Sequence, residues 1–227
     1  MNTYFQVKSN VEPIIESLAI VQNCFSLLDG DERKNFYNDK RSRFNYLKLN
    51  NNEETNLEKA TLFIFLTKTC FNGIFRVNKQ GLFNVPIGAK RPLLYDADNL
   101  RIISLLLQNV TLRNEDYKNC LDFADKNTFF YLDPPYRPIT KTSRSTLYTE
   151  TKFNDSEQIR LRNFMDEISE RGAKVVISNS DPKNNNKDDN FFDSLYGKYD
   201  ISRITTKRLI SCKSENRGNI SELLISN

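Results

Sequence analysis

The chain has 227 residues, of which 38% are hydrophobic and 27% charged, and its formal net charge is +4 at pH 7. This composition is typical of one sizeable folded domain, or a domain with a subdomain, and argues against a disordered chain. Histidine is absent, which excludes Ser-His and Cys-His catalysis and every metal site that needs imidazole. The four cysteines form no CxxC pair and no apolar run reaches membrane-spanning length, so we expect no metal, no membrane partner and a cytoplasmic protein with reduced thiols.

The first part of the chain is predicted to be mainly helical. Apolar residues recur at helical spacing over residues 4–28, with Pro13 as a candidate break. Residues 30–53 are dense in charge and favour a solvated amphipathic helix and loop, although their mixture of basic and aromatic side chains also occurs on nucleic-acid faces. Further helices are expected over 56–70 and 97–108, the latter with Ile102, Leu105 and Leu106 facing inward.

A hairpin is predicted between these last two helices. The turn signal Asn78-Lys79-Gln80-Gly81 separates two short β-prone runs, Ile74–Val77 and Leu82–Val85. A further short strand is expected at Thr111–Arg113.

The stretch from Thr128 to Tyr136, TFFYLDPPY, predicts a short buried strand with an abrupt end. The apolar run shows no alternation that would indicate an exposed face. Pro134 and Pro135 cannot donate to a sheet ladder, so the strand must stop before them. Asp133 and Tyr136 are therefore held at the carboxyl end of a strand, which is where open α/β sheets bind ligands.

After a polar, basic loop at 137–152, the pattern of the chain becomes regular. A helix begins at a cap formed by Asn154 or Asp155 and ends before Gly172, with five apolar residues inward: Ile159, Leu161, Phe164, Met165 and Ile168. Strands are expected at 174–178, 201–205 and 223–225, and a short helix at 191–196. Helices and strands alternate from residue 98 onward, which predicts an α/β fold with a mostly parallel sheet covered by helices.

Asp133 to Tyr136 carry the groups needed for chemistry at the exocyclic amine of adenine. The lone pair of this amine is delocalised into the ring, so the amine is a poor nucleophile. A carboxylate and a proline carbonyl can accept both amine hydrogens and free the lone pair, while the Tyr136 ring can stack on an extruded base, worth roughly 1–3 kcal/mol. The alternative is a plain Pro-Pro turn with an incidental aspartate. The preceding strand and the upstream hairpin favour the catalytic interpretation.

DPPY at 133–136, together with FNGIFRVNKQGLFNVPIG at 71–88, closely resembles the Dam family of DNA adenine-N6 methyltransferases, of the kind that act at GATC. The likeness extends from about Tyr4 to Leu224 and includes the strand end Val176–Asn179. The resemblance implies a Rossmann-like, S-adenosylmethionine-dependent methyltransferase sheet with a target-recognition subdomain. We expect a helical and hairpin recognition region at 1–96 and a catalytic region at 97–227, with double-stranded DNA as partner and S-adenosylmethionine as cofactor.

The resemblance also implies roles for individual residues. Asp133, Pro134, Pro135 and Tyr136 match the tetrad that holds the flipped adenine, and Asp116, Tyr117 and Asp133 fall where the family contacts the cofactor. The residues that match the DNA-facing hairpin are Phe71, Asn72, Arg76, Asn84 and Pro86. Family members usually continue with Gly-Arg-Tyr-Lys, whereas this chain has Gly88-Ala89-Lys90-Arg91, which shifts the basic contacts to Lys90 and Arg91. Lys141 and Arg144 are expected to add salt-dependent phosphate binding.

The chain departs from the family pattern at its front. Its glycines stand at positions 30, 73, 81, 88, 172, 197 and 218, so no Gly-x-Gly turn is present to approach a cofactor. Residue 1 aligns with the helix that normally follows the first cofactor-binding unit. The sequence therefore predicts a sheet without its first strand, whose apolar neighbours are exposed, and a complementing N-terminal fragment as a partner.

Three functions remain open on the sequence. The first is site-specific adenine-N6 methylation of DNA in a restriction-modification or Dam-like system. The second is a truncated remnant that binds DNA without methylating it, or one half of a split enzyme. The third is methylation of RNA or of protein amides, against which Asp133 and the upstream hairpin argue.

Overall fold

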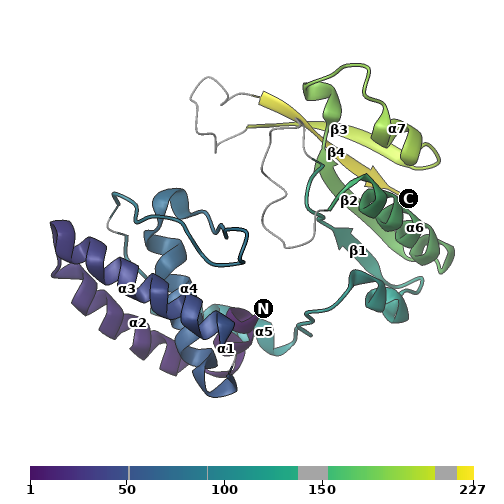
Figure 1. Ribbon diagram of the computed structural model, residues 1–227. Coiled ribbons are helices and arrows are strands. Elements are labelled where there is room, and N and C mark those ends of the chain that lie inside the picture. Colours follow the sequence, from purple (N-terminus) through teal and green to yellow (C-terminus); the bar gives the residue numbers. More distant parts are fainter. Residues whose placement is uncertain (51, 91, 138–152, 208–218) are drawn as a thin grey trace. The chain divides into compact units, whose positions relative to one another are not determined.

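The computed structural model describes residues 1–50, 52–90, 92–137, 153–207 and 219–227 (Figure 1). Contacts divide the chain into two compact units, Met1–Asn114 and Glu115–Asn227. Each unit has its own buried apolar clusters. The division into functional regions at 1–96 and 97–227 stays a prediction. Among the described residues, no helix is both long and apolar enough to cross a membrane.

Helices dominate the first unit, as predicted. They are α1 (Asn2–Ser9), α2 (Val11–Ser26), α3 (Gly30–Leu49), α4 (Asn56–Thr69) and α5 (Ala97–Gln108). The helical stretch expected over 4–28 is confirmed as two helices, and the break lies at Asn10, where the backbone leaves helical geometry with φ −138° and ψ 43°. Pro13 does not make this break. It lies in the first turn of α2, where a missing N–H costs nothing.

The face that α5 buries differs from the prediction. Ile102, Leu105 and Leu106 were expected to point inward, but they are 56%, 70% and 67% exposed. The buried position is instead Ser104, whose hydroxyl donates to the Lys8 carbonyl oxygen of α1. Helical periodicity identified the apolar stripe of α5 correctly, but it cannot say what that stripe packs against.

The predicted turn at 78–82 is present, but without regular strands. The Asn78 N–H donates to the Leu82 carbonyl oxygen at 2.8 Å, and Val77 forms an isolated antiparallel bridge with Phe83. A second isolated bridge joins Cys70 to Ile87. The segment 71–90 is thus a hairpin-like loop that depends on its surroundings for its shape. Thr111–Arg113, predicted as a strand, is irregular.

The second unit contains a four-stranded sheet in the order β1-β2-β4-β3 (Figure 1). The strands are β1 (Phe129–Leu132), β2 (Lys174–Ser180), β3 (Asp200–Lys207) and β4 (Asn219–Ser226). Only β1 and β2 run parallel, whereas β4 is antiparallel to both β2 and β3. The α/β class is confirmed, but the expectation of a mostly parallel sheet is wrong for the described strands, since antiparallel neighbours need no helical crossover.

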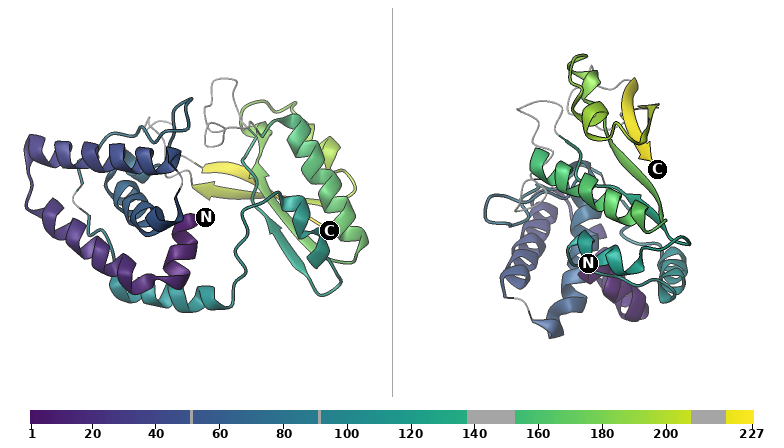
Figure 2. Two further views of the ribbon diagram at one scale, coloured as in Figure 1. Left: turned by 60° about the horizontal axis from the view of Figure 1, so that its bottom comes forward. Right: turned by 90° about the vertical axis from the view of Figure 1, so that its right-hand side faces the viewer.

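Helix α6 (Asp155–Glu170) lies along the sheet, and α7 (Phe191–Leu195) adds to the same core (Figure 2). The Asn154 side chain caps α6 by accepting from the Glu157 N–H, which confirms the predicted start. Gly172 follows the helix with φ +86°, a conformation that favours glycine. Four of the five apolar residues predicted to face inward are buried, while Ile159 is 42% exposed.

Strand β1 is present at its predicted position, but it is not fully buried. Its side chains alternate between faces: Phe130 and Leu132 pack against the core, whereas Phe129 and Tyr131 are 63% and 58% exposed. Side chains of a strand alternate between its two faces, and the face that carries Phe129 and Tyr131 is left uncovered at these positions. A continuous apolar run is typical of a strand that is buried on both faces. β1 is also an edge strand, which pairs only with β2 among the described strands.

Candidate functional site

The Asp133–Tyr136 turn lies beside the carboxyl end of β2. The parallel register pairs Leu132 with Ile177, so Asp133 emerges next to Ser178. The Ser178 hydroxyl donates to Asp133 Oδ1 at 3.0 Å. The carboxyl ends of the two parallel strands meet at one edge of the sheet, as ligand-binding α/β sheets require.

The two prolines differ in what their carbonyls do. The Pro135 carbonyl oxygen accepts from Gln158 Nε2 at 3.3 Å. Within the described residues, no donor bonds to the Pro134 carbonyl oxygen or to Asp133 Oδ2. The turn therefore keeps one carboxylate oxygen and one backbone carbonyl available as acceptors.

Tyr136 is half-buried at the end of this turn. Burial raises the pKa of its phenol above the ordinary value of 10.0, although the neighbouring Ser178 hydroxyl opposes the shift. Tyr136 is thus a neutral phenol near neutral pH. Its ring can serve as an uncharged stacking surface.

A polar cluster lies behind the turn. Gln158 on α6 and Asn179 on β2 are 0% and 1% exposed, and Asn179 Nδ2 donates to Gln158 Oε1 at 3.2 Å. Asn179 Oδ1 in turn accepts from the Arg137 N–H at 3.1 Å. The Ser180 hydroxyl donates to the Arg137 carbonyl oxygen at 2.8 Å. These contacts fix the backbone that follows Pro135.

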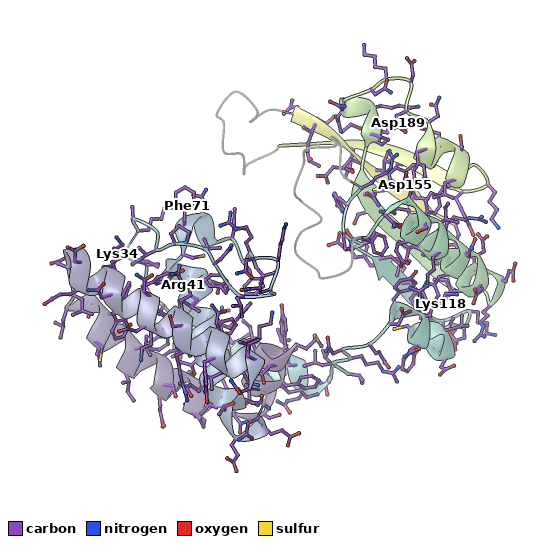
Figure 3. All side chains as sticks on the ribbon, viewed as in Figure 1. Lys34, Arg41, Phe71, Lys118, Asp155 and Asp189 are labelled. Carbon is purple, nitrogen blue, oxygen red and sulfur yellow. The ribbon has the colours of Figure 1, made fainter. Side chains whose placement is uncertain are left out.

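The Arg137 side chain, like its backbone, is held by several contacts. Its guanidinium donates to Asp155 and to Asp189, each at 2.8 Å, and lies 4.3 Å from the centre of the Phe191 ring. Figure 3 labels Asp155 at the start of α6 and Asp189 in the loop before α7. Hydrogen bonding to Arg137 lowers the pKa of the Asp189 carboxyl. Arg137 thus ties the turn to two further elements.

Sequence reasoning did not assign roles to Gln158 or Arg137, and it placed Ser178 and Asn179 only as part of a family-like strand end. A signal was nevertheless present. Ser178, Asn179, Ser180 and Asp181 follow an apolar strand directly, and all four are buried. Buried polar residues at the end of a strand need partners. Ser178, Asn179 and Ser180 find them at Asp133 or Arg137, and Asp181 finds them at Lys183 and Arg203.

Asp116 and Tyr117, the residues matched to cofactor contacts, lie beside α6. Asp116 accepts from Arg160 at 2.7 Å and from the Lys118 N–H at 2.9 Å, and hydrogen bonding to Arg160 lowers the pKa of its carboxyl. The Tyr117 ring packs on Phe164, with the Arg160 guanidinium 4.9 Å from the ring centre. Its hydroxyl is buried and has no hydrogen-bond partner in the described structure. Asp116 is therefore the exposed polar group of this pair.

A second set of candidate residues lies in the first unit, on the loop that follows α4. Phe71 is 55% exposed (Figure 3). Asn72 has φ +58° and is the only described residue other than glycine with a positive φ; Gly73 follows with φ +65°. Backbone strain of this kind is typical of functional loops. A Cβ on Gly88 would lie 2.9 Å from the Cys70 carbonyl oxygen, so the loop closes tightly at its base.

The side chains expected to read DNA are on the outside of this loop. Arg76 Nε donates to Asn84 Oδ1 at 3.0 Å, and both side chains are exposed. Pro86 and Lys90 are also exposed. The structure therefore brings Arg76 and Asn84 together. Arg91, Lys141 and Arg144 lie outside the described residues.

Helix α3 holds this loop in place. Asn45 accepts from the Phe83 N–H at 2.8 Å and donates to the Phe83 carbonyl oxygen at 3.0 Å. The Val85 carbonyl oxygen accepts from the Tyr37 hydroxyl and from Arg41 (Figure 3). The amphipathic helix expected within 30–53 is present as α3, which buries Tyr37, Phe44 and Leu47. Its side chains also hold the backbone of the loop at 71–90, which we call the recognition loop after its expected role.

Metal chemistry finds no support in the described residues, which contain no group of three or more Cys, Asp or Glu side chains that could hold an ion. The arrangement in the second unit offers acceptors for hydrogens and a stacking surface. Such a set suits a planar ring that carries an exocyclic amine.

Comparisons with known proteins agree with this chemistry. The model of one protein family, described as D12 class N6 adenine-specific DNA methyltransferase, matches residues 1–210. The chain is 43% identical to the Type II methyltransferase M.MjaIII of Methanocaldococcus jannaschii, over 100% of the chain and 76% of that relative. It is 31% identical to the Type II methyltransferase M1.LlaDCHI of Lactococcus lactis subsp. cremoris, over 100% of the chain and 75% of the relative. A DNA adenine methylase of Haemophilus influenzae is 29% identical over 99% of the chain and 73% of its own length.

Proposed function

The chain belongs to the D12 class of N6 adenine-specific DNA methyltransferases, and we propose that it methylates an adenine extruded from double-stranded DNA at Asp133–Tyr136. The observation that carries this proposal is the pair of open acceptors, Asp133 Oδ2 and the Pro134 carbonyl oxygen, beside the Tyr136 ring. We assign the activity to a restriction-modification or Dam-like role in the cytoplasm. The relatives named Type II methyltransferase and DNA adenine methylase support that role.

The two acceptors act on the two hydrogens of the adenine amine. Asp133 accepts one and the Pro134 carbonyl accepts the other, which draws the nitrogen toward tetrahedral geometry and frees its lone pair. Proline suits this task because its backbone is rigid. Tyr136 stacks on the extruded base and holds it at the turn. After transfer, the proton lost from N6 leaves through the Asp133 carboxylate to solvent.

S-adenosylmethionine is the proposed methyl donor, and it supplies a methyl group on a positively charged sulfur that keeps the bonding electron pair. Asp116 and Tyr117 are proposed to hold its adenosine; the support in the structure is that Asp116 is an exposed carboxylate. Asp133 is the proposed contact nearer the reacting atoms. These roles come from the family resemblance.

Target recognition is proposed for the loop at 71–90. Arg76 and Asn84 would contact base edges, Phe71 and Asn72 would enter the duplex, and Pro86 would pack on it. Among the basic residues, Lys90, Arg91, Lys141 and Arg144 would bind phosphates, which positions the protein without reading sequence. The support is the exposure of Phe71 and the shared hydrogen bond of Arg76 and Asn84.

The finer fold that we propose is the Rossmann-like methyltransferase sheet, in which β1 would have a further parallel neighbour. The outer edge of β1 is unpaired among the described strands, and Phe129 and Tyr131 are exposed beside it. Exposed edges of this kind are normally paired or covered. We therefore propose that a complementing segment, with a strand and a glycine-rich turn, adds to this edge.

The function is tested by methyl transfer with the variant Asp133→Ala. Loss of the carboxylate removes an acceptor that acts on the reacting nitrogen, so we expect transfer to fall at least about 100-fold, while DNA affinity changes little. Asp188→Ala is the matched control, because Asp188 is an exposed aspartate of the same unit. Transfer that survives in Asp133→Ala at the rate of Asp188→Ala would remove Asp133 from the mechanism.

The second candidate is a remnant that binds DNA without methylating it. The open edge of β1 favours this alternative. The same assay distinguishes the two functions, because a remnant retains DNA binding and shows no transfer in the unmodified protein, even at saturating cofactor.

A further inference from the structure

Four buried polar side chains surround the catalytic turn from behind. Gln158, Ser178, Asn179 and Ser180 are 0%, 4%, 1% and 7% exposed. Burying polar groups is costly unless each finds a partner. All four bond to the turn or to Arg137, which directly follows it. A core position that serves only stability is usually apolar. Four buried polar side chains at one place therefore indicate that they hold the turn in a defined position.

Ser178 controls how the Asp133 carboxylate is rotated. The terminal torsion of an aspartate is soft, so a free carboxylate samples many orientations. The 3.0 Å bond from the Ser178 hydroxyl to Oδ1 selects one of them and leaves Oδ2 without a donor among the described residues. Ser178 does not itself offer a group to the base, so it acts through Asp133 and through the neighbouring Tyr136 phenol.

Gln158 and Asn179 control the backbone of the turn. Their amides form a directed chain, from Arg137 N–H to Asn179 Oδ1, and from Asn179 Nδ2 to Gln158 Oε1. Gln158 Nε2 then donates to the Pro135 carbonyl oxygen. Asn179 Oδ1 also accepts from the Ser180 N–H, so flipping this amide would lose two bonds at once. The chain thereby occupies the Pro135 carbonyl and leaves the Pro134 carbonyl for the amine.

We propose that Ser178, Gln158 and Asn179 are positioning residues for methyl transfer: Ser178 aims the Asp133 carboxylate, and the Gln158–Asn179 pair sets the Pro134 carbonyl beside it. This proposal rests on the proposed function of the Asp133–Tyr136 turn. The backbone between the two acceptors is already restrained by proline, so the support acts on what stays free, the rotation of the Asp133 carboxylate and the path of the chain after Pro135. A displacement of about 1 Å at a reacting centre can cost 10²-fold in rate.

The experiment compares steady-state methylation by Ser178→Ala and Ser178→Thr. Removal of the hydroxyl is expected to lower kcat about 10- to 100-fold with KM for DNA unchanged, because base binding does not depend on the aim of the carboxylate. Ser178→Thr keeps a hydroxyl and should recover most of the kcat. Ser104→Ala is the matched control: Ser104 is 7% exposed, its hydroxyl donates to a backbone carbonyl, and it lies in the other unit.

Gln158→Met provides a second variant that keeps the length of the side chain and removes both amide bonds. A fall in kcat with unchanged KM for DNA is expected here too, and thermal unfolding of each variant shows whether the fold has been kept. The positioning role is overturned if Ser178→Ala and Gln158→Met retain the kcat of Ser104→Ala, or if Ser178→Thr fails to recover activity while unfolding like the unmodified protein. These results differ from failure of the proposed function, in which the unmodified protein itself transfers no methyl group to adenine.

Discussion

Arg137 directly follows the catalytic turn, yet its charge is already neutralised within its own unit. Asp155 and Asp189 both accept from its guanidinium. Other basic side chains of the second unit are paired with carboxylates in the same way: Arg160, Arg162, Lys183, Lys198 and Arg203. The net charge of +4 therefore does not mean that these groups are available to bind phosphates. Contacts to the DNA backbone must come from other basic residues.

Asp166 on α6 is one of these carboxylates and has three partners. It accepts from Arg162 and from the Tyr199 hydroxyl, each at 2.6 Å, and Lys198 lies 3.0 Å away. Burial raises the pKa of Asp166, but the hydrogen bonds from Tyr199, Lys198 and Arg162 outweigh it, and the pKa lies below the ordinary 3.8. The ionised form is therefore favoured in the folded protein.

The sign of the pH dependence follows from this shift. A carboxyl whose pKa is depressed on folding stabilises the protein above its unfolded pKa, and the contribution is lost as the pH falls through the folded pKa. We predict that Asp166→Asn lowers the free energy of unfolding near neutral pH and flattens its decline below about pH 4. Urea unfolding at a series of pH values measures both effects. An acid limb as steep as that of the unmodified protein would show that Asp166 does not contribute to it.

At the level of secondary-structure elements, α3 and the recognition loop form one functional assembly. The loop has no regular strands, so its shape depends on side chains of α3 that bond to its backbone. Asn45 supplies two of these bonds, both to Phe83. The proposed recognition role of the loop therefore also depends on the α3 residues that hold its backbone.

We predict that Asn45→Ala lowers the free energy of unfolding by about 1–3 kcal/mol, since two hydrogen bonds are lost. It should also weaken discrimination between target and mismatched sites, because the loop is no longer held. Methylation of a panel of DNA duplexes measures the discrimination. Arg76→Ala is the reference for a lost reading contact, and Asn35→Ala is the control on the exposed face of α3. If Asn45→Ala lowers the free energy of unfolding but leaves the target preference unchanged, the hold of Asn45 on the loop does not contribute to discrimination between DNA sites.

Most elements could be predicted from the sequence because local signals specify them. Asn154 caps α6, Gly172 ends it, and the turn at Asn78 to Gly81 forms as expected. Burial was harder to predict, because it depends on the neighbours of each element. The same apolar pattern that places Ile168 in the core leaves Leu105 in solvent.

The catalytic turn could likewise be located from DPPY, whereas its support could not. Gln158 lies 23 residues after Pro135 in the sequence. A helical pattern does not distinguish a buried glutamine that bonds to a turn from a glutamine in solvent. Only the parallel register of β1 and β2 reveals that Asp133 and Ser178 are neighbours. Residue types therefore predicted the reacting groups, and topology was needed for the residues that hold them.

For the whole molecule, the central question is how the methyl donor is held. The proposed acceptors lie in the second unit, while the sequence contains no Gly-x-Gly turn and the edge of β1 is unpaired among the described strands. We predict that the chain alone binds S-adenosylmethionine weakly, with a Kd of about 1 mM or higher. Titration calorimetry measures this affinity, and an ordinary micromolar Kd would show that the cofactor site needs no complementing segment.

The most direct test of the account identifies the methylated nucleoside. The chain is incubated with double-stranded DNA and S-adenosylmethionine at several millimolar, which compensates for weak cofactor binding, and the DNA is digested and analysed by mass spectrometry. If Asp133 and Pro134 act on an extruded adenine, the unmodified protein produces N6-methyladenine. DNA incubated with Asp133→Ala contains none. A methyl group found on cytosine, or no methylated nucleoside from the unmodified protein, would contradict the account.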